Sequence, residues 1–143
     1  MTLPDLITPQ SRFFAGVLLV SLPSIAFGGA SLLWMLRQRD PGYVDNPARK
    51  ALFRAGHAHA GVLVILALVG MLWVDAAHLT ATWKTVARLG LAAAPIFISA
   101  GFFFSILPSK QDKPGPLISL VYVGATALVV ATVTLGVGLF RTS

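Results

Sequence analysis

The stretch that decides the fold is residues 55–74, AGHAHAGVLVILALVGMLWV. It contains no formally charged side chain, and a helix needs about 20 such apolar residues to cross the hydrocarbon core of a bilayer. Three more runs of similar length cover about residues 13–36, 86–107 and 117–140. They show no period-two alternation and are about twice as long as the strand of a membrane barrel. We therefore expect an all-α, polytopic membrane protein whose residues 1–143 form one domain, a bundle of four transmembrane helices.

The composition supports this reading and excludes several kinds of site. The chain is 56% hydrophobic and only 11% charged, with a mean hydropathy of +0.80. A soluble domain of this size could not cover so much apolar side chain, so the lipid bilayer is the expected surrounding. The chain has no cysteine and no glutamate, which excludes a thiolate metal site and a glutamate-based di-metal cluster. No catalytic set of residues stands out, and whether the protein is an enzyme stays open.

The net charge of +6 reflects membrane topology rather than nucleic-acid binding. The basic residues lie between the apolar runs and form no patch with interleaved aromatic residues. By the positive-inside rule, the side with more Lys and Arg faces the cytoplasm. One side carries seven of them and the other four. The seven are Arg37, Arg39, Arg49, Lys50, Arg54, Lys110 and Lys113; the four are Arg12, Lys84, Arg88 and Arg141.

This count predicts a multi-pass protein of the plasma membrane, the inner membrane of a bacterium, with both termini outside.

The segment Met1–Gln10 has no basic region before an apolar core, so we expect no signal peptide and a retained first span. The second helix is expected to begin in water, because Asn46-Pro47 is a typical N-cap followed by proline at the first helical position.

A weak internal repeat runs through the chain. Pro23 and Pro95 are 72 residues apart, as are Gly29 and Gly101. The turn 37–42, RQRDPG, is echoed by 110–115, KQDKPG. The pattern fits two parallel helical hairpins related by an axis along the membrane normal, although proline, glycine and turn residues recur in any polytopic protein.

The functional candidate is the segment Gly56–Gly61, GHAHAG, near the cytoplasmic end of the second span. Ionisable residues inside a span indicate function by default, and burial favours the neutral imidazole. Residues two apart on a helix point about 200° apart. His57 and His59 therefore cannot hold one metal ion unless the flanking Gly56 and Gly61 allow the helix to unwind. In a regular helix one ring would face the bundle and the other a second subunit.

Three interpretations of the pair remain open. The first is haem ligation by an imidazole nitrogen, with haem b as the cofactor. Its second axial ligand would come from another subunit or be absent, since His78 lies roughly 30 Å further along the helical stretch. The second is a transition-metal site at His57 and His59, weakened by the lack of acids in the spans. The third is structural, with each ring hydrogen-bonded to a neighbouring helix. His78, three residues after Asp75, is expected to form an exposed pair with it.

The segment Gly56-His57-Ala58-His59-Ala60-Gly61, leading into a long Leu/Val/Ile helix, resembles a histidine-rich helix of the haem-copper oxidase catalytic subunits and their nitric-oxide-related relatives. In that superfamily a histidine on an early helix ligates low-spin haem. The resemblance covers about a dozen of the 143 residues. The chain lacks the later histidine pair that would bind copper and a tyrosine-linked histidine, so oxygen reduction is not implied. The resemblance implies a haem-binding or gas-related role for His57 or His59.

Two functions follow. The first is a haem- or metal-binding membrane protein in electron transfer, gas sensing or respiratory-chain support, with His57 and His59 as ligands and Arg54 one turn before them. The second is a non-catalytic accessory or assembly subunit of a membrane complex with structural histidines. Either would act as a homo-oligomer or with a partner membrane subunit.

Overall fold

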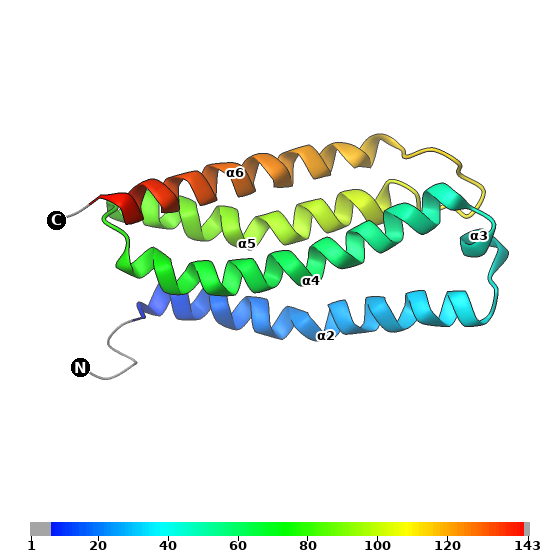
Figure 1. Ribbon diagram of the computed structural model, residues 1–143, viewed down its shortest axis with the longest axis horizontal. Coiled ribbons are helices and arrows are strands. Elements are labelled where there is room, and N and C mark those ends of the chain that lie inside the picture. Colours follow the sequence, from blue (N-terminus) through cyan, green and yellow to red (C-terminus); the bar gives the residue numbers. More distant parts are fainter. Residues whose placement is uncertain (1–6, 142–143) are drawn as a thin grey trace.

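The computed structural model describes residues 7–141, which fold into four long helices joined by short connections (Figure 1). The predicted all-α class is confirmed, and no strand occurs in this range. The first six residues, part of the segment expected to lack a signal peptide, lie outside the described range. The long helices are α2 (Pro9–Arg37), α4 (Pro47–Ala76), α5 (Ala81–Phe104) and α6 (Ser119–Phe140). A short helix α3 (Pro41–Val44) and a 3-10 turn η1 (Pro116–Ile118) lie in two of the connections.

Side-chain caps fix where three of the long helices begin. Thr8, Asn46 and Thr80 accept hydrogen bonds from the backbone N–H groups three residues later. Such caps satisfy N–H groups that have no partner inside the helix. The predicted start of the second helix at Asn46-Pro47 is therefore confirmed.

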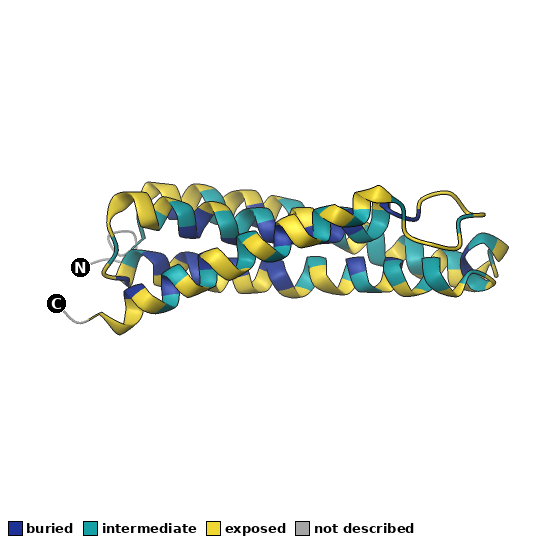
Figure 2. Ribbon diagram, turned by 90° about the horizontal axis from the view of Figure 1, so that it is seen from above, coloured by how far each residue is buried: buried dark blue, intermediate teal, exposed yellow. Residues whose placement is uncertain are grey.

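All four long helices are apolar enough to cross a membrane. Many large apolar side chains lie on the outside of the bundle, among them Val20, 81% exposed, and Phe27, 74% exposed (Figure 2). In water this surface would aggregate, whereas lipid solvates it without penalty. The chain is a multi-pass membrane protein.

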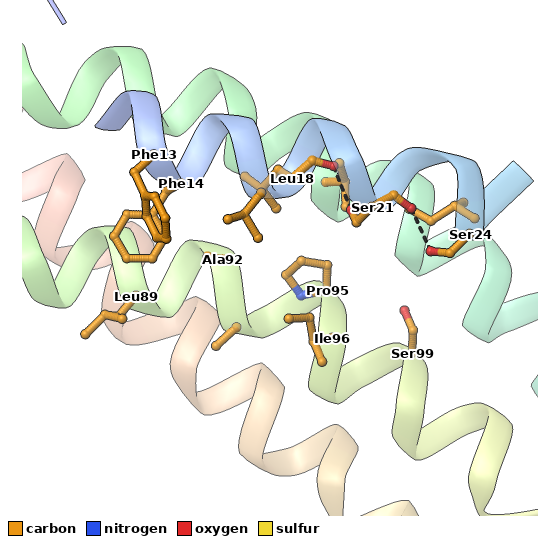
Figure 3. Close-up of a pocket in the computed structure, with 14 residues that line it drawn as sticks. Phe13, Phe14, Leu18, Ser21, Ser24, Leu89, Ala92, Pro95, Ile96 and Ser99 are labelled. Atoms are coloured by element: carbon orange, nitrogen blue, oxygen red, sulfur yellow. Dashed lines mark hydrogen bonds between the residues drawn. The ribbon is translucent and has the colours of Figure 1, made fainter. Parts of the chain in front are cut away.

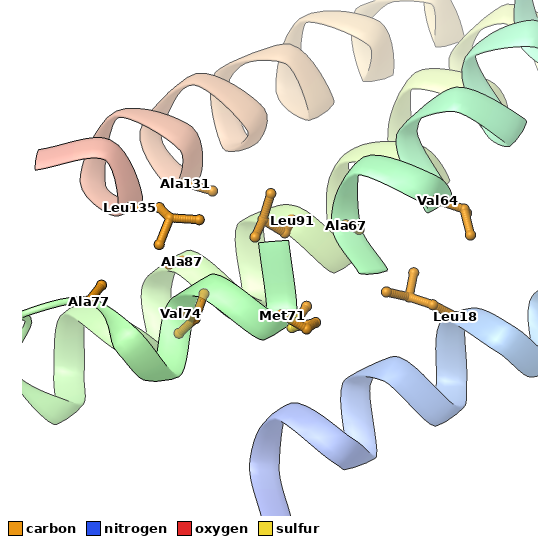
Figure 4. Packing of buried hydrophobic residues seen from close by; sticks show 10 residues of the cluster. All are labelled: Leu18, Val64, Ala67, Met71, Val74, Ala77, Ala87, Leu91, Ala131 and Leu135. Atoms are coloured by element: carbon orange, nitrogen blue, oxygen red, sulfur yellow. The ribbon is translucent and has the colours of Figure 1, made fainter. Parts of the chain in front are cut away.

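The bundle is organised around α4 and α5. In Figure 1, α2 and α6 lie at opposite edges with α4 and α5 between them, and both described ends of the chain lie at one end of the bundle. The largest buried cluster joins α4, α5 and α6 and includes one residue of α2, Leu18 (Figure 4). Its members are Leu18, Val64, Ala67, Met71, Val74, Ala77, Ala87, Leu91, Ala131 and Leu135. Helix α2 buries only Ser11 and Leu18 and is the least embedded of the four.

Glycines allow α5 to approach its neighbours closely. A methyl group placed on Gly90 would lie 2.7 Å from the carbonyl oxygen of Ala127 in α6. One placed on Gly124 would lie 2.8 Å from the backbone nitrogen of Ile98. Small residues at helix contacts are typical of membrane bundles, because close packing replaces the hydrophobic effect between helices.

Both helical hairpins place a glycine of the proposed repeat at their internal contact. Gly29 of α2 faces His57 of α4, and Gly101 of α5 faces Val121 of α6. Pro23 and Pro95 both lie inside the first helix of their hairpin. The duplication itself stays a prediction, but the two hairpins differ in what fills the space opposite the glycine.

We predict that Gly124→Ala lowers the free energy of unfolding by about 1–3 kcal/mol, because the added methyl overpacks a backbone contact. Gly136→Ala, on the same helix but with nothing within 4 Å of the new methyl, serves as the control. It is expected to be neutral or to stabilise by up to about 1 kcal/mol. Unfolding in detergent micelles by titration with dodecyl sulfate, followed by circular dichroism, measures both. Equal losses for the two variants would contradict the packing described.

Candidate functional site

The segment Gly56–Gly61 is regular α-helix inside α4. The local unwinding that would let both histidines hold one ion is not adopted. Gly56 is buried against Phe102 and Phe103 of α5, where it permits close packing, whereas a methyl group on Gly61 would meet nothing within 4 Å. The two imidazoles therefore have separate surroundings, as helical spacing predicts.

His57 packs against α2. A methyl group placed on Gly29 would lie 2.8 Å from Cε1 and 2.9 Å from Nε2 of the ring, and Gly28 lies near Nδ1. The imidazole therefore occupies a notch that only glycine leaves open. Its Cε1 and Nε2 atoms lie next to Gly29, so the ring packs against α2 although it is only partly buried.

His59 lies on the outside of the bundle, half-way round α4 from His57. Its Nδ1 atom is 2.7 Å from the carbonyl oxygen of Ala55. Because a carbonyl oxygen can only accept, the neutral ring donates from Nδ1 and keeps the lone pair of Nε2 free. The ring of Phe102 lies beside it, with centroids 5.1 Å apart and planes tilted by 43°. His59 is thus fixed in tautomer and restrained in orientation while Nε2 stays available.

Arg54 and His57 share a pocket with Lys50 between α2 and α4, about 520 Å³ in volume. Leucines of α2 form the opposite wall. Tyr43 of α3 also lines the pocket, which therefore lies at the end of the bundle where Figure 1 shows α3. Arg54 therefore belongs to the surroundings of His57 rather than of His59.

A second pocket of about 540 Å³ lies between α2 and α5 and is almost wholly apolar (Figure 3). Phe13 and Phe14 lie at one end and Ser24 and Ser99 at the other. The hydroxyl groups of Ser21 and Ser24 donate to carbonyls of their own helix, whereas the buried hydroxyl of Ser99 has no hydrogen-bond partner among residues 7–141. This space exists because α2 is packed mainly on α4, and neither histidine of the Gly56–Gly61 segment lines it.

A buried polar cluster that was not predicted from the sequence lies at the opposite end of the bundle. The carboxylate of Asp75 pairs with the guanidinium of Arg88 at 2.5 Å, and both side chains are only 6% exposed. Thr8 donates to both carboxylate oxygens, from its backbone nitrogen at 2.9 Å and its hydroxyl at 3.0 Å. Arg88 also donates from Nε to Ser11 at 2.9 Å. The cluster ties the start of α2 to the last turn of α4 and to α5.

The expected pair of Asp75 with His78 is therefore wrong. The carboxylate is bound by Arg88 and Thr8, while His78 is exposed and its backbone nitrogen donates to Gly138 at 2.9 Å. The available signal was an acid near the end of one span and a base 13 residues later near the start of the next. Arg88 lies inside α5 and is not the loop charge expected from the sequence.

Within residues 7–141, no three His, Cys, Asp or Glu side chains come together as a metal-ion site. The site offers one available imidazole nitrogen, Nε2 of His59. One such ligand suits a cofactor that needs a single protein ligand from each subunit. Comparisons of the chain with known protein families, with curated proteins and with solved structures find no match.

We predict that Asp75→Asn lowers the free energy of unfolding by about 3 kcal/mol, because it leaves the buried Arg88 unpaired. Asp112→Asn, a change at an exposed acid, should alter it by no more than about 0.5 kcal/mol. Adding Arg88→Met to Asp75→Asn should recover part of the loss. The same micelle titration measures all three variants, and equal costs for Asp75→Asn and Asp112→Asn would show that the cluster contributes nothing.

Proposed function

We propose that this membrane protein binds haem b through Nε2 of His59 and acts in electron transfer, gas sensing or respiratory-chain support. The observation that carries the proposal is the hydrogen bond from Nδ1 of His59 to the Ala55 carbonyl. Histidines that ligate metals almost always donate their other ring nitrogen to a carbonyl, carboxylate or water, which fixes the tautomer and raises the basicity of the ligating atom. His59 already has this arrangement in the structure, with Nδ1 bonded to the Ala55 carbonyl.

The surface around His59 suits a flat apolar group. Val62, 65% exposed, and Leu66, 40% exposed, lie one and two turns further along α4. Phe102 flanks the ring from α5. These side chains offer apolar contact to a macrocycle, and haem requires only one or two axial ligands from protein. When bound, the haem iron would carry one electron or hold a gas molecule.

The outward position of His59 favours a homo-oligomer. His59 of a second copy would supply the other protein ligand to the same haem. His78 lies on a connection at the far end of the bundle and is not proposed as a ligand. By the excess of Lys and Arg at the α3 end, the proposed site faces the cytoplasmic side of the plasma membrane.

A second function is favoured by the surroundings of His57. Its ring fills the space opposite Gly28 and Gly29 and so has a packing role. If His59 also binds nothing, the protein would be a non-catalytic accessory or assembly subunit of a membrane complex.

The visible absorption spectrum tests the proposal. We expect the protein purified in detergent, or titrated with haemin, to show a Soret band with a histidine-ligated spectrum. Loss of a residue that only hydrogen-bonds a ligating side chain typically lowers affinity by roughly 10- to 100-fold. His59→Ala removes the ligand itself and should lower the affinity for haemin by more than this. His57→Ala and His78→Ala are the controls and should retain the band.

A well-folded protein that takes up no haemin would contradict the haem proposal and favour the accessory subunit. Loss of the band in His57→Ala with retention in His59→Ala would show that His57 is the ligand and that the choice of His59 is wrong. A band unaffected by all three changes would show adventitious haemin in the micelle.

A further inference from the structure

The pocket between α2 and α4 combines two kinds of lining. Lys50, Arg54 and His57 are spaced by four and three residues and lie on one face of α4. Leu32, Leu33 and Leu36 of α2 form the other wall. Cationic groups therefore face aliphatic side chains across one cavity of about 520 Å³.

The two cations have no counter-ion within the described chain. The one ion pair in residues 7–141 is that of Asp75 and Arg88, at the other end of the bundle. Near the pocket, the Asp40 carboxylate accepts from the backbone nitrogen of Gly42, and Asp45 and Asp112 are exposed without an ion pair in this range. The positive end of the α4 dipole also lies at this end, because α4 begins at Pro47. The pocket is thus complementary to an anion.

The depth of the lining residues along the helix axis indicates which kind of anion would fit. Lys50 and Arg54 are in the first two turns of α4, where the helix emerges from its apolar run, and His57 lies roughly 4–5 Å deeper than Arg54 along the axis. Leu33 and Leu36 are 55% and 49% exposed on a helix apolar enough to cross a membrane. A small phosphate ester would pair with the cations and leave these leucines uncovered, whereas a phospholipid covers both.

We infer that this pocket is a binding site for an anionic phospholipid, with the phosphate held by Lys50 and Arg54 and an acyl chain lying along Leu33 and Leu36. The imidazole of His57 lies at the level where the chain leaves the headgroup. Basic pockets between helices on the cytoplasmic side are typical places for anionic headgroups. The site is separate from Nε2 of His59 and does not depend on haem binding.

Native mass spectrometry of the full chain tests the site. The protein is first exposed to vesicle lipids so that bound lipids exchange, and it is then measured after release from detergent micelles. With equal phosphatidylglycerol and phosphatidylcholine present, we expect preferential retention of phosphatidylglycerol. Lys50→Gln with Arg54→Gln should lower that retention by roughly 25-fold, about fivefold for each charge. The charge-matched control is Arg12→Gln with Arg141→Gln, two exposed cations at the opposite end, which should retain the lipid.

Lys50→Arg with Arg54→Lys keeps both charges and should bind as the natural chain does; it also reports on folding if the glutamine variant expresses poorly. Equal retention of the two lipids, or equal losses in the test and control pairs, would overturn the inference. Displacement of phosphatidylglycerol by millimolar glycerol 3-phosphate would assign the pocket to a soluble phosphate ester and overturn it as well.

Discussion

The structure depends on close packing between helices, because in lipid the hydrophobic effect does not drive helices together. In lipid, every backbone polar group must be satisfied within its own segment, so the chain forms helices, and these must then associate through contact alone. Glycines of α5 and α6 supply that contact by letting the two backbones approach, and Gly56 and Gly70 of α4 leave room for side chains of α5. The three helices form the packed part of the molecule, and the position of each functional side chain follows from them.

Helix α2 is attached differently, and its attachments explain two polar features. At one end, the Asp75–Arg88 pair with Thr8 and Ser11 replaces apolar burial. Near the other, the ring of His57 fits the notch at Gly28 and Gly29. Removing one partner of a buried ion pair is costly because the other charge is left unpaired, so the cluster holds the start of α2 in one position. Between the two attachments α2 stands away from α5, which leaves the apolar pocket of Figure 3.

Much of the fold could be predicted because its signals are local. Apolar length alone identifies the four spans, and Asn46-Pro47 identifies a helix start. Helical spacing also predicts that His57 and His59 point apart. The Asp75–Arg88 pair and the His57–Gly29 contact could not be predicted, because each depends on which helix lies beside α4 and at what height. Nothing in the sequence distinguishes His57 from His59; only the neighbours Gly29 and Phe102 give them different roles.

Haem binding as proposed requires an outward His59 whose Nε2 lone pair is free. The most direct measurement is nitrogen NMR of the protein labelled with ¹⁵N-histidine, in nanodiscs at neutral pH without haem. We expect one imidazole to carry its proton on Nδ1 with an unprotonated Nε2, and that pair of resonances to vanish in His59→Ala but not in His57→Ala. If the His59 ring carries its proton on Nε2, or on both nitrogens, the lone pair is not available and the central claim is wrong.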